Sequence, residues 1–103
     1  MEKITLADGR EIYLFAAASV LTNFKKTFGK SMLSGFEEDD KQFEEKLFFI
    51  VYEAARAGCK IKGENFDYKV ADFMDLLSLS DAIEQVKIIT AKVAGTAPQK
   101  KTR

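Results

Sequence analysis

The sequence predicts a mainly α fold (α+β), with an N-terminal β-hairpin followed by a bundle of about four helices. Two observations carry this prediction. Two short alternating runs flank Asp8-Gly9, and this pattern is a strong hairpin signal. After Phe15 the apolar residues recur at helical spacing between glycine and serine breaks. We therefore expect one domain over residues 1–95 and a disordered basic tail over residues 96–103.

The register of the hairpin follows from its apolar faces. A two-residue loop of Asp8-Gly9 would place the apolar residues of the two runs on opposite faces. A three-residue loop over 7–9, with Gly9 in the left-handed conformation, pairs Ile4 with Ile12 instead. Burial favours the second register, because it brings the apolar side chains to one face that a helix can cover: Ile4, Leu6, Ile12 and Leu14.

The first two helices are placed by their apolar stripes and their end signals. The first is expected over about residues 16–28, with Gly29 as its stop and a loop over 30–35. The second is the longest and most apolar. The acidic run 37–40 suits its N-terminus, where the helix dipole favours negative charge. Two assignments of its N-cap are possible. Ser34 has capping-box spacing to Glu37, and Asp39 or Asp40 could cap a later start.

Further along the chain, Gly58 is expected to end the second helix, and residues 59–64 are expected to form a loop. Asn65 can cap a third helix that runs to about Leu77. Ser78 or Ser80 then caps a fourth helix, which Gly95 stops. The buried stripe of this last helix is expected to consist of Ala82, Val86, Ile89 and Val93.

Several large apolar side chains lie away from these stripes. On the second helix, Phe49 and Tyr52 point well away from the stripe that contains Leu47 and Val51. Either the helix is buried on two sides, or this second face binds a partner. The candidate partner-binding residues are Phe48, Phe49, Tyr52 and Ile88. An apolar surface of that size also predicts a homo-oligomer.

The residue types argue against catalysis and against a metal or cofactor site. The chain has no histidine, so Cys59 has no partner base of the usual kind. The acidic run 37–40 lacks the spacing of a calcium loop, and Lys30-Ser31 follows a single glycine rather than a phosphate loop. We expect no enzyme, no catalytic residue, no cofactor and no metal.

Charge and hydropathy limit the classes of partner and the cell compartment that we expect. Sixteen basic residues balance sixteen acidic ones, which argues against nucleic acid as a partner. No apolar run is long enough to cross a membrane, and no signal peptide is recognisable. A single cysteine fits a reducing cytoplasm.

With its elements in this order, the chain resembles the short tail assembly chaperones of long-tailed (siphovirus-type) bacteriophages and their prophages. The resemblance covers about residues 3–95 and is carried by segments 4–14, 20–30, 71–77 and 81–86. These hold a strand–turn–strand opening, a helix with aromatic and basic residues, and an acid-containing apolar segment before the last helix. This sequence would correspond to the short, unextended form.

The resemblance implies a function and two partners. Such chaperones bind the long, apolar, helical tape measure protein before the tail tube forms around it. They also recruit tail tube protein through a C-terminal extension that ribosomal frameshifting adds. The resemblance places the protein in the cytoplasm of the infected or lysogenic host and outside the mature virion. Two alternatives remain open: a small phage head–tail connector or neck adaptor protein, and a helical DNA-binding regulator.

Overall fold

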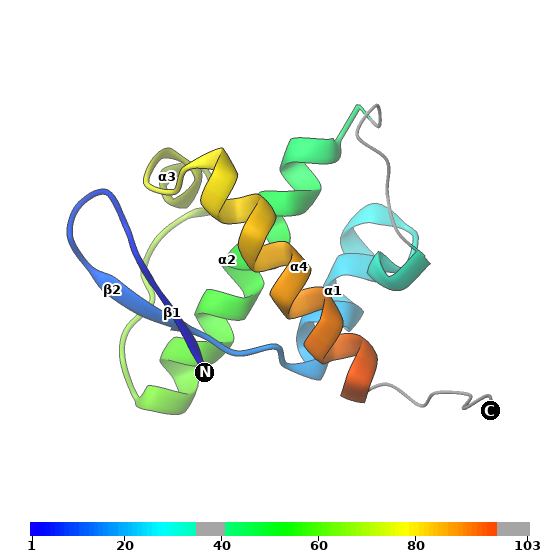
Figure 1. The fold of residues 1–103 in the computed structure, drawn as a ribbon, viewed down its shortest axis with the longest axis horizontal. Coiled ribbons are helices and arrows are strands. Elements are labelled where there is room, and N and C mark those ends of the chain that lie inside the picture. The colour runs from blue at the N-terminus through cyan, green and yellow to red at the C-terminus, as the bar shows by residue number, and fades with distance from the viewer. Residues whose placement is uncertain (35–40, 97–103) are drawn as a thin grey trace.

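The computed structural model describes residues 1–34 and 41–96. An antiparallel hairpin precedes a group of packed helices, which confirms the predicted fold class (Figure 1). The elements in chain order are β1 (Glu2–Thr5), β2 (Glu11–Leu14), α1 (Ala18–Phe28), the short 3₁₀ helix η1 (Met32–Ser34), α2 (Phe43–Lys62), α3 (Val70–Asp75) and α4 (Leu79–Thr96).

The hairpin has the expected register. Ile4 pairs with Ile12, and Gly9 has a φ of 91°, which glycine adopts without steric cost. The Leu6 amide donates to the Arg10 carbonyl at 2.8 Å, and the Gly9 amide donates to the Leu6 carbonyl at 2.9 Å. The predicted apolar face is buried, each side chain being at most 7% exposed: Ile4, Leu6, Ile12 and Leu14.

Helix α2 is the central element. Strand β2 and helices α1, α3 and α4 all pack against it, and Figure 1 shows it crossing the middle of the molecule. Ile50, Val51 and Ala54 are fully buried. The predicted apolar stripe of this helix therefore faces the core, and the helix is covered from several directions.

Helix α2 does not end at Gly58, as the sequence predicted. It continues through residues 59–62, which were expected to lie in a loop, and ends at Gly63, whose φ is 72°. Gly58 is buried inside the helix against the backbone of Tyr13. A glycine is needed at position 58 because the strand approaches the helix closely there, and not because the helix ends there. The acidic run 37–40, which includes Asp39 and Asp40, lies outside the described residues. The helix begins at Phe43 after Gln42, so Ser34, which belongs to η1, does not cap it.

Helix α1 begins at Ala18, two residues later than expected, and ends at Gly29 in the left-handed conformation. Val20 and Phe24 are its buried residues. The expected loop over 30–35 contains η1, and Met32 within it is 1% exposed. This short turn adds a core side chain that helical periodicity alone could not identify.

The third helix is much shorter than predicted. Asn65 does not cap it. The chain from 64 to 69 has no regular structure, and the six-residue α3 begins at Val70 after Lys69. Phe66 and Tyr68 lie in this irregular segment and pack against Tyr52 and Phe73. Aromatic packing against α2 therefore outweighs the helical tendency of this segment.

Helix α4 agrees with the prediction at its start and on its buried face. The Ser78 hydroxyl accepts a hydrogen bond from the Asp81 amide at 3.2 Å, as a helix cap does. The predicted stripe is at most 7% exposed: Ala82, Val86, Ile89 and Val93. The helix passes Gly95 and includes Thr96, one residue beyond the expected boundary. The rest of the predicted tail, 97–103, lies outside the described residues. No described helix meets the length and hydropathy needed to cross a membrane.

Candidate functional site

The linker between β2 and α1 carries an exposed aromatic side chain at the surface of α2. Leu14 points into the core, so Phe15 points the other way by strand alternation. The Phe15 amide donates to the Ala54 carbonyl of α2 at 3.0 Å, which fixes the backbone of the linker on that helix. The side chain is nevertheless 39% exposed. Phe15 is thus rigidly placed at its backbone and accessible at its ring.

Phe15 lines an open hollow of about 620 Å³ on the outer face of α2. Its wall includes apolar side chains from three parts of the chain: Phe15, Ala57, Ile61 and Phe66. Ile61 is 54% exposed. Charged and polar side chains complete the rim, namely Glu53, Arg56, Lys60, Glu64 and Asn65. A hollow of this kind can accept one apolar side chain of a ligand, while the residues next to that side chain stay in water.

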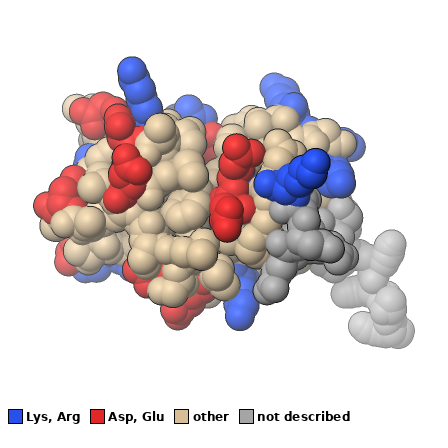
Figure 2. Space-filling view, turned by 90° about the horizontal axis from the view of Figure 1, so that it is seen from above, with Lys and Arg blue, Asp and Glu red and all other residues tan. Residues whose placement is uncertain are grey.

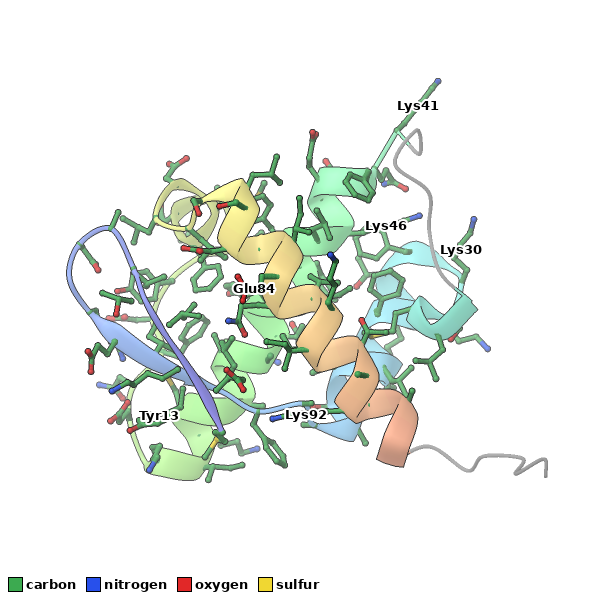
Figure 3. All side chains as sticks on the ribbon, viewed as in Figure 1. Tyr13, Lys30, Lys41, Lys46, Glu84 and Lys92 are labelled. Carbon is green, nitrogen blue, oxygen red and sulfur yellow. The ribbon has the colours of Figure 1, made fainter. Side chains whose placement is uncertain are left out.

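Phe15 also lines a second, smaller hollow of about 380 Å³, between the start of β1 and the last turns of α4. Its other apolar residues are Met1, Leu14, Ala16, Ile88 and Ile89. Met1 is 51% exposed. Lys92 and Glu2 stand at the rim with 4.0 Å between their charged groups, and Figure 3 shows Lys92 beside the start of β1. The two hollows share Phe15 and form one candidate site.

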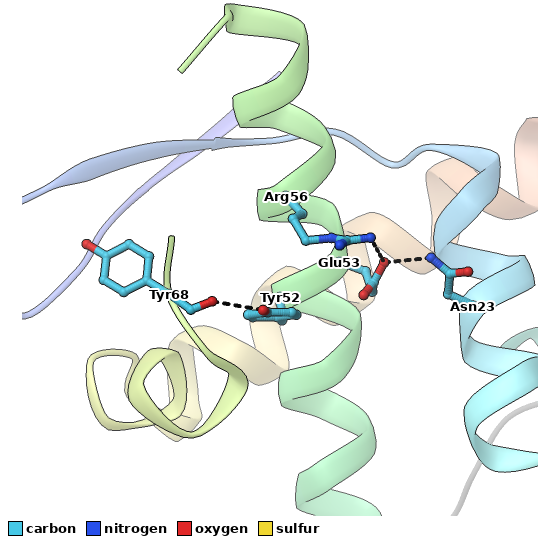
Figure 4. A network of polar contacts seen from close by, with 5 residues as sticks. All are labelled: Asn23, Tyr52, Glu53, Arg56 and Tyr68. Atoms are coloured by element: carbon cyan, nitrogen blue, oxygen red, sulfur yellow. Dashed lines mark hydrogen bonds and ion pairs between the residues drawn. The ribbon is translucent and has the colours of Figure 1, made fainter. Parts of the chain in front are cut away.

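A polar network forms part of the wall of the larger hollow (Figure 4). The Asn23 amide of α1 donates to Glu53 Oε1 at 2.8 Å, and Arg56 Nη2 lies 3.5 Å from the same oxygen. Glu53 is 8% exposed, so this carboxylate depends on both partners. Glu53 is paired with Arg56, and Lys60 and Glu64 add one charge of each sign to the same rim. Because the rim charges balance, the site favours an apolar ligand over a strongly charged one.

An aromatic cluster, which shares Phe66 with the larger hollow, covers another part of α2. The ring centroids of Tyr52 and Phe66 are 5.2 Å apart, and those of Tyr52 and Phe73 are 5.6 Å apart. The Tyr52 hydroxyl donates to the Tyr68 carbonyl at 2.8 Å (Figure 4). These contacts hold segment 64–69 on α2.

The hairpin tip fastens the same segment from outside. Arg10 Nη2 donates to the Asn65 carbonyl at 2.6 Å, and its guanidinium lies over the Tyr68 ring at 5.4 Å. The Tyr68 hydroxyl donates to Asp8 Oδ2 at 3.0 Å. Hydrogen bonding with the Tyr68 side chain is the main cause that raises the pKa of Arg10. The tip of the hairpin is therefore structural.

The four partner-binding residues predicted from the sequence lie in different surroundings. Phe48 is 7% exposed and belongs to the core. Phe49 contacts the rings of Phe24 and Phe28 on α1, with centroids 6.2 and 5.4 Å away. Tyr52 belongs to the aromatic cluster. Ile88 alone lines the candidate site, in its smaller hollow.

Sequence reasoning did not single out Phe15, Ile61 or Met1. Strand alternation gives a signal for Phe15, because the residue after an inward Leu14 must point outward. Ile61 had no such signal, since the prediction ended the helix at Gly58 and left Ile61 in a loop. Its place on α2 follows only from the continued helix.

Cys59 is not an accessible thiol. It is 1% exposed, and burial raises its pKa above the ordinary value of 9.0 despite the nearby Arg10 charge. A raised pKa keeps the thiol in its unreactive, protonated form at neutral pH. Within residues 1–34 and 41–96 no group of three acidic, cysteine or histidine side chains could hold a metal ion.

The surface charge gives no sign of a basic patch on the face that Figure 2 shows. Most of that face is neutral, with acidic side chains spread over it and basic ones mostly near its margins. The formal net charge of the whole chain is zero. A nucleic-acid interface needs a concentrated positive field, which this face does not present.

Comparisons with protein-family models, with curated proteins and with solved structures give no match.

Proposed function

We propose that this chain is a phage tail assembly chaperone that holds an apolar helical stretch of a tape measure protein in the two hollows around Phe15. The observation that carries the proposal is the exposed Phe15 ring, which lines both hollows and is 39% exposed on a fixed backbone. A helix presents apolar side chains three and four positions apart on one face, so a single helix can offer one side chain to each of two hollows that share Phe15. The sequence resemblance supplies the class of client.

The chemistry of the site supports binding rather than catalysis. Its rim charges balance in number, with Arg56–Glu53 and Lys92–Glu2 as pairs. Its walls offer apolar contact from Phe15, Ile61 and Ile88. Exposed apolar surface of this kind is what a binding protein needs for an apolar client. Such a chaperone would act in the cytoplasm of the host cell, where tails assemble.

The test is a titration of a fluorescently labelled helical fragment of the tape measure protein that the same phage or prophage encodes. We expect Phe15→Ser to weaken binding by about tenfold or more, because a buried aromatic ring contributes about 1.5–3 kcal/mol. Leu79→Ser is the matched control. Leu79 is 44% exposed and lies at the start of α4, roughly 15 Å along the helix from Ile89.

Circular dichroism is the control that checks whether both variants keep the fold. Equal affinity of wild type and Phe15→Ser would remove this site from the proposal. Failure of the wild type to bind any fragment of the tape measure protein would contradict the proposed function itself.

A further inference from the structure

The larger hollow has one wall that belongs to no helix or strand. Residues 64–66 form this wall segment, and Figure 1 shows the chain returning here from the end of α2 past the hairpin to α3. No amide of residues 65–69 donates a hydrogen bond to another group of the described chain. The position of the wall segment therefore depends on contacts that other parts of the chain make to it.

One side chain holds the backbone of this wall segment. Arg10 Nη2 donates to the Asn65 carbonyl at 2.6 Å, and within the described chain no other hydrogen bond reaches the backbone of residues 65–67. The Asn65 carbonyl belongs to the same peptide group as the Phe66 amide, and a peptide group is planar and stiff. A bond that fixes this carbonyl therefore also fixes the direction in which the chain enters Phe66.

The guanidinium of Arg10 is itself held in place. It lies over the Tyr68 ring at 5.4 Å, and the Tyr68 hydroxyl donates to Asp8 Oδ2 at 3.0 Å. Asp8 Oδ1 accepts a hydrogen bond from the Arg10 amide at 3.1 Å. A planar guanidinium can stack on a ring and donate a directed hydrogen bond at the same time, which a lysine ammonium cannot do equally well.

The same hairpin also positions a second wall of the hollow. At the end of β2, the Phe15 amide donates to the Ala54 carbonyl and so places the Phe15 ring at the hollow. Phe15 and Phe66 are the two aromatic residues that line it. The hairpin thus holds Phe15 through the backbone of the linker and Phe66 through the side chain of Arg10.

We propose that Arg10 is a positioning residue of the larger hollow, which orders the wall at Phe66 before a ligand binds. Arg10 does not line the hollow itself. The inference rests on the proposed function, because it concerns the same binding site. A wall that is already ordered loses less conformational entropy when a ligand binds, and this preorganisation raises the affinity.

The first test uses the free protein and needs no ligand. We expect NMR backbone order parameters of about 0.85 for Asn65 and Phe66 in the wild type, and values below about 0.6 in Arg10→Ala. The turn should persist in this variant, because the bond from the Leu6 amide to the Arg10 carbonyl joins two backbone groups. Order parameters along α2 should stay at their wild-type values, which separates a local loss of order from unfolding.

Two further variants make the test specific. Lys3→Ala is the matched control, since Lys3 also lies over a tyrosine ring, that of Tyr13 at 5.8 Å, but its partners lie within the hairpin. It should leave the wall segment ordered. Arg10→Lys should give order parameters between those of the wild type and Arg10→Ala, because a lysine can bond to Asn65 or lie over Tyr68 but lacks the planar fork.

The second test is the titration with the labelled fragment of the tape measure protein. Arg10→Ala should weaken binding by at least about fivefold, because the wall segment must then become ordered on binding. A saturating amount of the fragment should restore the order parameter of Phe66 in this variant. Lys3→Ala should bind as tightly as the wild type.

Wild-type order parameters for the wall segment in Arg10→Ala overturn the inference, whatever the titration gives. A disordered wall with unchanged affinity also overturns it, because Arg10 would then have no effect on the binding site. A wild type that binds no fragment contradicts the proposed function instead, and the measurement on the free protein still decides whether Arg10 orders the wall.

Discussion

The Tyr13 carbonyl lies against the backbone of Gly58, so that a β-carbon at position 58 would overlap the carbonyl oxygen and lie 2.6 Å from its carbon. Two small neighbours on the same helix, Ala54 and Ala55, are also fully buried. Strand β2 thus crosses α2 at a place where the helix has almost no side chains. This close crossing brings Phe15 to the Ala54 carbonyl and so positions the candidate site.

Gly58→Ala should destabilise the protein by about 2 kcal/mol or more, because both colliding groups belong to the backbone and cannot rotate away. Helix propensity alone predicts the opposite sign, a gain of about 1 kcal/mol. Urea unfolding decides between the two. Ala57→Gly, at the preceding helical position, measures the propensity term alone. A Gly58→Ala protein as stable as the wild type would contradict the close packing.

Gly9→Val should destabilise the hairpin by about 1–3 kcal/mol through its backbone alone. The φ of Gly9 is 91°, which a β-branched residue adopts poorly, while a β-carbon at this position would meet no atom within 4 Å. Gly9→Asn should cost less, since asparagine tolerates the left-handed region. Thermal melting followed by circular dichroism compares them. Unchanged melting of Gly9→Val would count against the bulged turn.

The three tyrosines should respond differently to loss of their hydroxyl groups. Tyr52→Phe should cost about 1 kcal/mol, because a partly buried hydrogen bond to the Tyr68 carbonyl is lost. Tyr68→Phe should cost about 0.5 kcal/mol, since its bond to Asp8 is exposed. Tyr13→Phe is the control, because its hydroxyl has no hydrogen bond within the described residues. Chemical denaturation gives the order, and a larger loss for Tyr13→Phe would contradict it.

Burial of Cys59 predicts a loss of stability in alkali. The folded pKa is raised above 9.0, so stability is fully present below the unfolded pKa and declines as the pH rises through the folded value. As the pH rises above about 9, the wild type should progressively lose stability relative to Cys59→Ala. Parallel pH profiles that do not diverge would contradict this. Cys59→Ser should leave client binding intact, since the thiol is not exposed.

Local patterns predicted the hairpin and the last helix well, because neighbouring residues decide both. Alternation around Gly9 fixes which residues share a face, and the Ser78 cap with a regular stripe fixes α4. The end of α2 could not be predicted this way. Whether Gly58 stops a helix or admits a strand depends on Tyr13, which is distant in the sequence.

The predictions of the third helix and of the candidate site failed for the same physical reason. Phe66 fits a helical pattern with Phe73, but both rings pack against Tyr52, and this tertiary contact keeps segment 64–69 out of a helix. Periodicity on α2 likewise drew attention to Phe49. The accessible ring belongs instead to Phe15, in a linker that no helical stripe describes.

Phe49→Ser and Ile88→Ser should therefore have different effects. Phe49 lies against Phe24 and Phe28, so its loss should destabilise the fold by about 2 kcal/mol or more. Ile88 is half-buried and lines the smaller hollow, so its loss should cost about 1 kcal/mol or less and still weaken client binding. Urea unfolding and the titration with the tape measure fragment measure the two effects on each variant.

The outcome for each single variant assigns each residue to the core or to the site. If Phe49→Ser keeps its full stability but loses binding, the ring of Phe49 contacts the client rather than α1. If Ile88→Ser binds as well as the wild type, the smaller hollow is not part of the binding surface. Separate variants are needed because a double substitution that unfolds the chain would conceal the role of Ile88.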